Sequence, residues 1–173
     1  MDSTKPQGSI NGQEERDLLF ARLFGIMAVI QSGLVVRTTP LASSASSSNL
    51  PSSLESYEQL LTSLVGLGEQ KTWLRESAWF AISLLVNALH ESDVLWKEEA
   101  VTSTMELLFV KNVVWSTEKV ALALKLQDLY PKREWKTFLA PTFKNSDLLS
   151  TGNLPTIARI LKVCGCLVRQ ASN

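Results

Sequence analysis

Carboxylates are the first side chains to examine for chemistry, because nucleotidyl transfer requires two metal ions held by acidic groups a few ångströms apart. The aspartates are scattered over separate segments of the chain: Asp2, Asp17, Asp93, Asp128 and Asp147. Two denser acidic groups fall at the start or on the polar face of predicted helices, where acids favour the helix dipole or stay solvated. These are Glu14 and Glu15 with Asp17, and Glu98 with Glu99. We therefore predict no catalytic carboxylates and no metal site.

The other residue types that support catalysis are equally sparse. His90 is the single histidine, which excludes multi-histidine metal sites, and its predicted place in the last turn of a helix suits the helix dipole. Gly66 and Gly68 lack the basic partner of a Gly-x-x-x-x-Gly-Lys phosphate loop. Cys164 and Cys166 are too few for a disulfide framework or a zinc ribbon, as is typical of an intracellular chain. We expect no enzyme and no cofactor.

One tryptophan has basic neighbours. Lys132, Arg133 and Lys136 surround Trp135, and basic side chains beside an aromatic ring can contact a nucleic-acid backbone. The other tryptophans fall once or twice per predicted helix, which is typical of half-buried rings between packed helices. The sequence therefore offers these three basic residues as possible phosphate contacts, with a solvated helix face as the alternative.

The charge is unevenly distributed along the chain. There are 17 basic and 17 acidic residues in all, but residues 1–115 hold 8 basic and 13 acidic side chains and residues 116–173 hold 9 and 4. Such a split suits a basic end that meets phosphates or an acidic partner, or simply unequal solvated faces. Because a polyanion-binding domain is usually basic overall, the zero net charge argues against autonomous nucleic-acid binding.

Length and composition favour a packed helical protein. The 173 residues are 45% hydrophobic, enough for one domain or for roughly three to five helical repeat units. The apolar stretch 18–36 is interrupted by Arg22, Gln31 and Ser32, and its uncharged run 23–30 is far shorter than the ~20 residues of a membrane span. We therefore expect a buried helix there and no membrane association.

Apolar periodicity predicts a succession of helices. The predicted spans are 14–32, 54–67, 73–90, 94–110, a helix from Ser116 or Thr117 to Pro131, and a last helix after Asn153. Thr72, Asp93 and Asn153 are the predicted caps, and Gly33, Gly66 and Gly68 the predicted stops. Residues 1–12 are predicted to be a polar tail, 38–53 a Ser-rich linker and 135–141 irregular. The first helix is apolar nearly all round, so we expect neighbours on several of its sides.

The helices group into pairs of repeating length. The pairs 54–90 and 93–130 match the period of HEAT or armadillo repeats, in which each pair buries its apolar face against its neighbours. A four-helix bundle would have helices and loops of similar length. The predicted fold class is all-α, with armadillo- or HEAT-like stacked helix pairs over residues 13–162, as in a fragment of an α-solenoid.

Three segments match the motifs of one known family in the family's own order. The first reads Arg22-Leu23-Phe24-Gly25 and continues through Ile30-Gln31-Ser32-Gly33. The second is Lys71-Thr72-Trp73-Leu74-Arg75-Glu76. The third is Thr151-Gly152-Asn153-Leu154-Pro155, leading into Ala158-Arg159-Ile160-Leu161-Lys162. Over residues 14–162 the chain therefore resembles the DNA polymerase V (DNA polymerase phi) and Myb-binding protein 1A family.

The resemblance implies an armadillo-like fold in a nucleolar protein of the nucleus, tied to ribosomal DNA transcription and ribosome assembly. The implied partners are ribosomal DNA chromatin or pre-ribosomal particles, with protein partners on the helical surfaces. The leading hypothesis is a non-catalytic scaffold fragment with DNA or chromatin association. One alternative is a fragment of a DNA-directed DNA polymerase whose catalytic part lies elsewhere, and another is a general protein–protein adaptor.

The resemblance ends at Lys162, and residues 163–173 form an atypical tail. Family members are far longer, so the chain resembles an amino-terminal piece. Val163-Cys164 can be encoded by an intron start and Ser172-Asn173 by a branch-type sequence, which suggests translated intron; a genuine short protein is the alternative. We expect the last helix to lack a partner for its apolar residues, and the isolated chain to be marginally stable. These apolar residues are Ile157, Ile160, Leu161 and Val163.

Overall fold

The computed structural model of the chain describes residues 12–33, 53–112, 115–144 and 154–171. Most of these residues are helical and none of them is in a strand, which confirms the all-α fold class. The helices are α1 (Gly12–Gln31), α3 (Ser53–Gln70), α4 (Arg75–Glu91), α5 (Lys97–Met105), α6 (Thr117–Leu129), α7 (Trp135–Lys144) and α8 (Leu154–Ala171), with the 3₁₀ turn η1 (Thr72–Leu74) and the π-helix η2 (Glu106–Lys111). The predicted tail 1–12 and linker 38–53 lie almost entirely outside the described residues, so the domain division stays a prediction.

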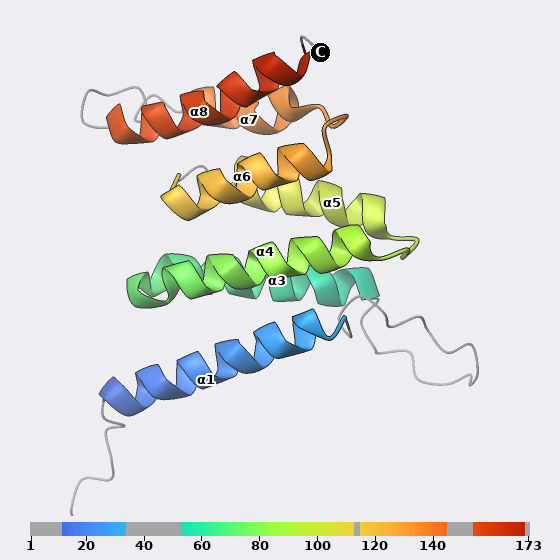
Figure 1. Cartoon of the computed structure of the whole chain (residues 1–173). Coiled ribbons are helices and arrows are strands. Elements are labelled where there is room, and N and C mark those ends of the chain that lie inside the picture. Colours follow the sequence, from blue (N-terminus) through green and yellow to red (C-terminus); the bar gives the residue numbers. More distant parts are fainter. Residues whose placement is uncertain (1–11, 34–52, 113–114, 145–153, 172–173) are drawn as a thin grey trace, which may run out of the picture.

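The helices pack in two layers (Figure 1). In the front layer, α1 contacts α4, α4 contacts α6 and α6 contacts α8. In the rear layer, α3 contacts α5, and η2, which continues α5, contacts α7. One hydrophobic core runs between the layers from Leu23 of α1 to Val163 of α8. The assignment of these stacked helices to armadillo or HEAT repeats stays a prediction.

Helix α1 buries only one of its sides. Leu23, Met27 and Ile30 recur at helical spacing and pack into the core against α4. The large apolar side chains left exposed are Leu18, Phe24 and Val29. The expectation of neighbours on several sides is therefore wrong for the part of the chain that the structure describes. None of the helices in the described ranges is long and apolar enough to cross a membrane.

Several predicted helix ends are confirmed. Gly33 has a φ of 73°, a left-handed conformation that suits glycine, and its N–H donates to the Ile30 carbonyl after α1. The predicted start at Ser116 or Thr117 is confirmed, because α6 begins at Thr117, and the Ser116 hydroxyl caps it by accepting a hydrogen bond of 3.2 Å from the Lys119 N–H. Helix α6 ends before Pro131.

Gly66 and Gly68 do not end a helix, because α3 continues through both to Gln70. The structure gives a packing reason for the second glycine. A Cβ atom at Gly68 would lie 3.3 Å from Nε1 of Trp79 and 3.4 Å from Cβ of Ala78. Gly68 therefore lets α4 pack closely on α3. The sequence alone predicts that a helix ends at this glycine.

Thr72 and Asp93 are not helix caps. The residue that precedes η1 is Lys71, and η1 runs directly into α4, whose first residue follows Leu74 without a side-chain capping bond. Helix α5 begins only at Lys97, beyond Asp93. A 3₁₀ turn thus starts α4 where the sequence suggests a hydroxyl cap. The third predicted cap, Asn153, lies outside the described residues.

The prediction of one α-helix over residues 94–110 is wrong about where the helix begins and about its helix type. Leu95, a predicted core residue, is fully exposed in the turn before α5. From Glu106 the chain widens into a π-helix, a form that is rare in proteins and frequent at functional sites. This widened turn buries Leu108 and Phe109 at the end of the rear-layer helix.

Residues 135–141 are helical, although they are predicted to be irregular. Helix α7 carries Pro141 in its interior, at the expense of one backbone hydrogen bond. Trp135, Leu139 and Thr142 are buried along one side of this helix, and the packing of that side outweighs the local effect of proline.

Helix α8 is longer and better packed than predicted. It begins at Leu154, has Pro155 in its first turn as expected, and continues past Lys162 to Ala171. Ile160 and Val163 are 4% and 0% exposed in the shared core, where α8 packs on α6. The expectation that both lack a partner helix is therefore wrong, whereas Leu161 is 60% exposed as expected.

Candidate functional site

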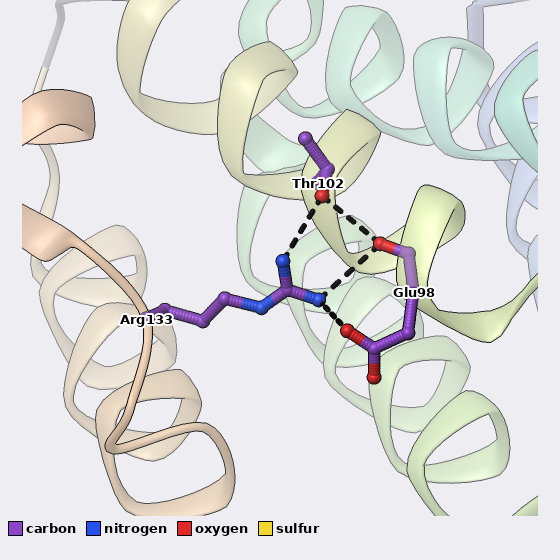
Figure 2. A network of polar contacts seen from close by, with 3 residues as sticks. All are labelled: Glu98, Thr102 and Arg133. Carbon is purple, nitrogen blue, oxygen red and sulfur yellow. Dashed lines mark hydrogen bonds and ion pairs between the residues drawn. The ribbon is translucent and has the colours of Figure 1, made fainter.

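The basic residues around Trp135 were the predicted phosphate contacts, and one of them is held by the rear layer. Arg133 forms an ion pair with the Glu98 carboxylate (Figure 2). Its guanidinium also donates to the Thr102 hydroxyl at 3.2 Å and to the Glu98 carbonyl at 3.3 Å. Arg133 therefore fastens the turn between α6 and α7 onto α5, and a phosphate would have to compete with these acceptors.

The remaining residues of this group separate into exposed lysines and a buried ring. Lys132 and Lys136 are exposed, with the exposed carboxylate of Glu134 between them in sequence. Trp135 is only 2% exposed, and its Nε1–H donates to the Tyr130 carbonyl at 3.2 Å. A nucleic-acid base therefore has no access to the ring for stacking. The phosphate contact stays a prediction, with Lys132 and Lys136 as its accessible members.

A buried lysine is the most unusual polar group that the structure describes. Lys119, in the first turn of α6, is 0% exposed, and its amine donates to the backbone carbonyl of Asn112. The amine also lies 5.2 Å from the ring centre of Trp115 and 5.7 Å from that of Phe109, within the range of cation–π attraction. Asn112 in turn donates to the Glu69 carboxylate at the end of α3. This network joins the ends of α3 and η2 to the start of α6.

The environment of Lys119 changes its protonation. Burial lowers the pKa of its amine to about 7, against the opposing effect of the Glu69 carboxylate. An amine that is partly neutral near pH 7 can act as a nucleophile in an open site. Because Lys119 is fully covered, a substrate has no access to it, and the arrangement supports structural cohesion instead.

A groove of about 290 Å³ lies between α4 and α6 on the front layer. Each helix contributes one stripe of residues at positions i, i+3, i+4 and i+7. The α4 stripe is Glu76, Trp79, Phe80 and Ser83, and the α6 stripe is Glu118, Ala121, Leu122 and Lys125. We call this recess the α4–α6 groove. It has carboxylates at one end, an apolar middle and a polar far end.

The two helices run in the same direction, which aligns these stripes. Lys125 donates to the Ser83 hydroxyl at 2.9 Å, so the last positions of both stripes meet at one end. Burial lowers the pKa of Lys125, and the Glu91 carboxylate opposes that effect. Phe80 is 55% exposed in the middle of the groove, while Trp79 beside it is 6% exposed. The groove is thus open at Phe80 and closed by Trp79 beside it.

His90 lies where the sequence predicts, in the last turn of α4. Its ring meets that of Tyr130 edge-on, with 5.3 Å between the ring centres. Among the residues that the structure describes, no three histidine, cysteine or acidic side chains gather to hold a metal ion. Cys164 is a half-buried free thiol whose pKa is raised by burial, which makes it a weaker nucleophile.

Comparison with known proteins decides the family. The family model for DNA polymerase phi matches residues 1–170. The chain belongs to the DNA polymerase phi family. The resemblance found in the sequence motifs is thereby confirmed, and the matched region includes residues 163–170 of the segment predicted to be an atypical tail. No solved structure matches the chain.

One curated member of the DNA polymerase phi family is similar along most of the chain. It is the rDNA transcriptional regulator pol5 of Schizosaccharomyces pombe (strain 972 / ATCC 24843), with 25% identity over 155 residues. The similarity covers 90% of this chain but only 15% of that relative, so the chain spans a small part of the relative's length. The relative is named as a regulator of transcription, and not as a polymerase.

Sequence reasoning missed the α4–α6 groove and the buried lysine. A signal for the groove was available, because Glu-x-x-Trp-Phe and Glu-x-x-Ala-Leu begin their helices in the same register. Lys119 gave no such signal, because a lysine in the first turn of a helix beside Glu118 suggests a solvated position. Its burial depends on the π-helix that brings Phe109 next to Trp115, with 5.7 Å between ring centres.

Proposed function

We propose that this chain is part of a non-catalytic nucleolar scaffold that acts in ribosomal DNA transcription and ribosome biogenesis and associates with DNA or chromatin there. The observation that carries the proposal is the family match over residues 1–170, together with a relative named as a regulator of ribosomal DNA transcription. Because the chain covers 15% of that relative, the activity and partners of a whole family protein enter only as part of this proposal.

The architecture supports a binding role. The front layer presents the open α4–α6 groove and several large apolar side chains, which suit contacts with other proteins. The proposed partners are ribosomal DNA chromatin or pre-ribosomal particles, reached through proteins that dock on the helices. Of the three predicted phosphate contacts, Lys132 and Lys136 are the accessible ones, since Arg133 is paired with Glu98.

Chromatin immunoprecipitation of the endogenously tagged protein tests this proposal. We expect enrichment of ribosomal DNA over single-copy genes, relative to an untagged strain. We also expect direct DNA binding by the purified chain to be weak and to fall steeply with salt, because phosphate contacts release counterions. A uniform distribution of the protein over the genome would overturn the proposal and favour the alternative of a general protein–protein adaptor.

The family's name favours a second candidate, a DNA-directed DNA polymerase. Its test is primer extension with Mg²⁺ by the whole protein that contains this segment. The scaffold proposal predicts no incorporation above that of a mock preparation from cells that lack the gene. Incorporation that follows the protein through purification would favour the polymerase.

A further inference from the structure

The α4–α6 groove combines an apolar anchor point with an acidic end. Phe80 is 55% exposed at its centre, beside Leu122 and the buried face of Trp79. A large side chain placed against Phe80 would remove apolar surface from water, which contributes about 25 cal/mol per Å². The groove therefore has a place for one apolar side chain of a partner.

The charges that line the groove indicate which polar side chains a partner must carry. Glu76 and Glu118 begin the two stripes at the same end, and neither carboxylate has an ion-pair partner within the described residues. Each lies in the first turn of its helix, where the dipole supplies only about half a positive charge. Lys125, the cation of the lining, lies at the far end and donates to Ser83. The open end is therefore net acidic.

We propose that the α4–α6 groove binds a short extended segment of a basic protein, with one Arg or Lys between Glu76 and Glu118 and one large apolar side chain against Phe80. The helical rise of about 1.5 Å per residue places Glu76 and Phe80 about 6 Å apart along the axis, which an extended chain covers in about two residues. The basic and apolar residues of the partner therefore stand about two positions apart. This inference rests on the proposed scaffold function and names the partner class of its groove.

The same charges exclude other occupants. The carboxylates repel the phosphates of a nucleic acid and the side chains of an acidic peptide, and like charges in contact cost binding energy. A purely apolar segment would leave Glu76 and Glu118 without a counter-charge while covering them. A segment with one basic and one apolar residue matches the acidic end and the apolar middle of the groove.

A peptide array tests the proposal with the 173-residue chain. The array holds seven-residue peptides in which Arg or Lys stands one to four positions from Leu, Met or Phe, with matched sets that carry Glu for the basic residue or Ser for the apolar one. We expect binding to peak near a separation of two, with a Kd on the order of 10–100 μM for the best peptide. Both matched sets should bind at least about tenfold more weakly.

Variants of the chain then place the peptide. We expect Phe80→Ser, and the double variant Glu76→Gln with Glu118→Gln, each to raise the Kd about tenfold. The matched controls are Phe24→Ser on α1 and Glu99→Gln on α5, both at exposed positions outside the groove, and they should leave the Kd within about twofold. Circular dichroism of each variant checks that the helices are intact.

The outcomes separate this inference from the proposed function. If no peptide binds, if the Glu set binds as well as the basic set, or if the controls weaken binding as much as the groove variants, the groove assignment is overturned. Enrichment at ribosomal DNA can persist in each of those cases. Loss of that enrichment contradicts the proposed function even where the groove binds basic peptides.

Discussion

The Tyr57 hydroxyl lies 2.8 Å from the Thr104 hydroxyl, in the buried contact between α3 and α5. The direction of this bond follows from a second one, because the Thr104 hydroxyl donates to the Ala100 carbonyl at 2.7 Å. Tyr57 is therefore the donor and Thr104 the acceptor. Burial raises the pKa of Tyr57, so the phenol keeps its proton and the bond at ordinary pH. This pair fixes how two rear-layer helices meet.

Removing this bond should destabilise the chain measurably. We expect Tyr57→Phe to lower the free energy of unfolding by about 1 kcal/mol, and Thr104→Val by about 1–3 kcal/mol because it leaves a buried phenol without an acceptor. Urea unfolding followed by circular dichroism measures both. The double variant should cost less than the sum of the single ones, and strict additivity would show that the two hydroxyls are not coupled.

Lys119 should make stability depend on pH. Because burial lowers the pKa of its amine to about 7, the unfolded chain binds more protons than the folded chain between that value and the usual 10.5. Stability contributed by this group is therefore smallest near pH 7 and below, and it rises with pH by at most about 1.4 kcal/mol per pH unit.

The test compares urea unfolding of the wild type with that of Lys119→Met between about pH 7 and pH 8.5, below the range in which tyrosines titrate. The difference in the free energy of unfolding between the wild type and Lys119→Met should change with pH, because the wild type gains stability as the pH rises. The exposed Lys136→Met serves as the control and should follow the wild type. Parallel curves for wild type and Lys119→Met would contradict the lowered pKa.

Two glycines of α3 form a matched pair. Gly66 has nothing within 4 Å of an added Cβ, so Gly66→Ala should stabilise the chain by about 0.5–1 kcal/mol through helix propensity. At Gly68 the new methyl would press on Trp79 Nε1 at 3.3 Å, which offsets that gain. Thermal unfolding should therefore rank Gly66→Ala above Gly68→Ala, and equal gains would show that α4 does not pack so closely there.

Arg133 should contribute modestly to the free energy of unfolding. Its partner Glu98 is largely exposed, so the ion pair itself contributes at most about 1 kcal/mol. We expect Arg133→Met to cost about 1 kcal/mol in urea unfolding, because the Thr102 and carbonyl contacts are lost as well, and Lys132→Met to cost almost nothing. If both variants weakened DNA binding equally without loss of stability, the basic residues would be free phosphate contacts instead.

Periodicity predicted the helices well and their ends less well. The apolar spacing of Leu23, Met27 and Ile30 is a local signal, and so is the Ser116 cap. Gly68 and Pro141 carry local signals for helix ends, yet both lie inside helices. Tertiary packing decides these positions, through Trp79 in one case and the buried side of α7 in the other.

The candidate site was harder to predict than the fold. The α4–α6 groove joins positions 42 residues apart, such as Ser83 and Lys125, on two helices that run in the same direction. The matching helix starts hint at it in the sequence, but the layering is needed to bring the two helices together. The basic residues near Trp135 formed a compact cluster in sequence, but Arg133 turns toward α5 (Figure 2). Neighbouring positions in the sequence therefore predicted a larger accessible basic surface near Trp135 than the structure has. They did not predict the α4–α6 groove.

Labelling of newly made RNA tests the central claim most directly, that the protein acts at ribosomal DNA. In cells that express it, rapid depletion of the protein should lower the synthesis of pre-ribosomal RNA within the first labelling period, while transcripts of single-copy genes are unchanged. Re-expression of the wild-type protein should restore synthesis. Unchanged pre-ribosomal RNA synthesis after complete depletion would contradict the account.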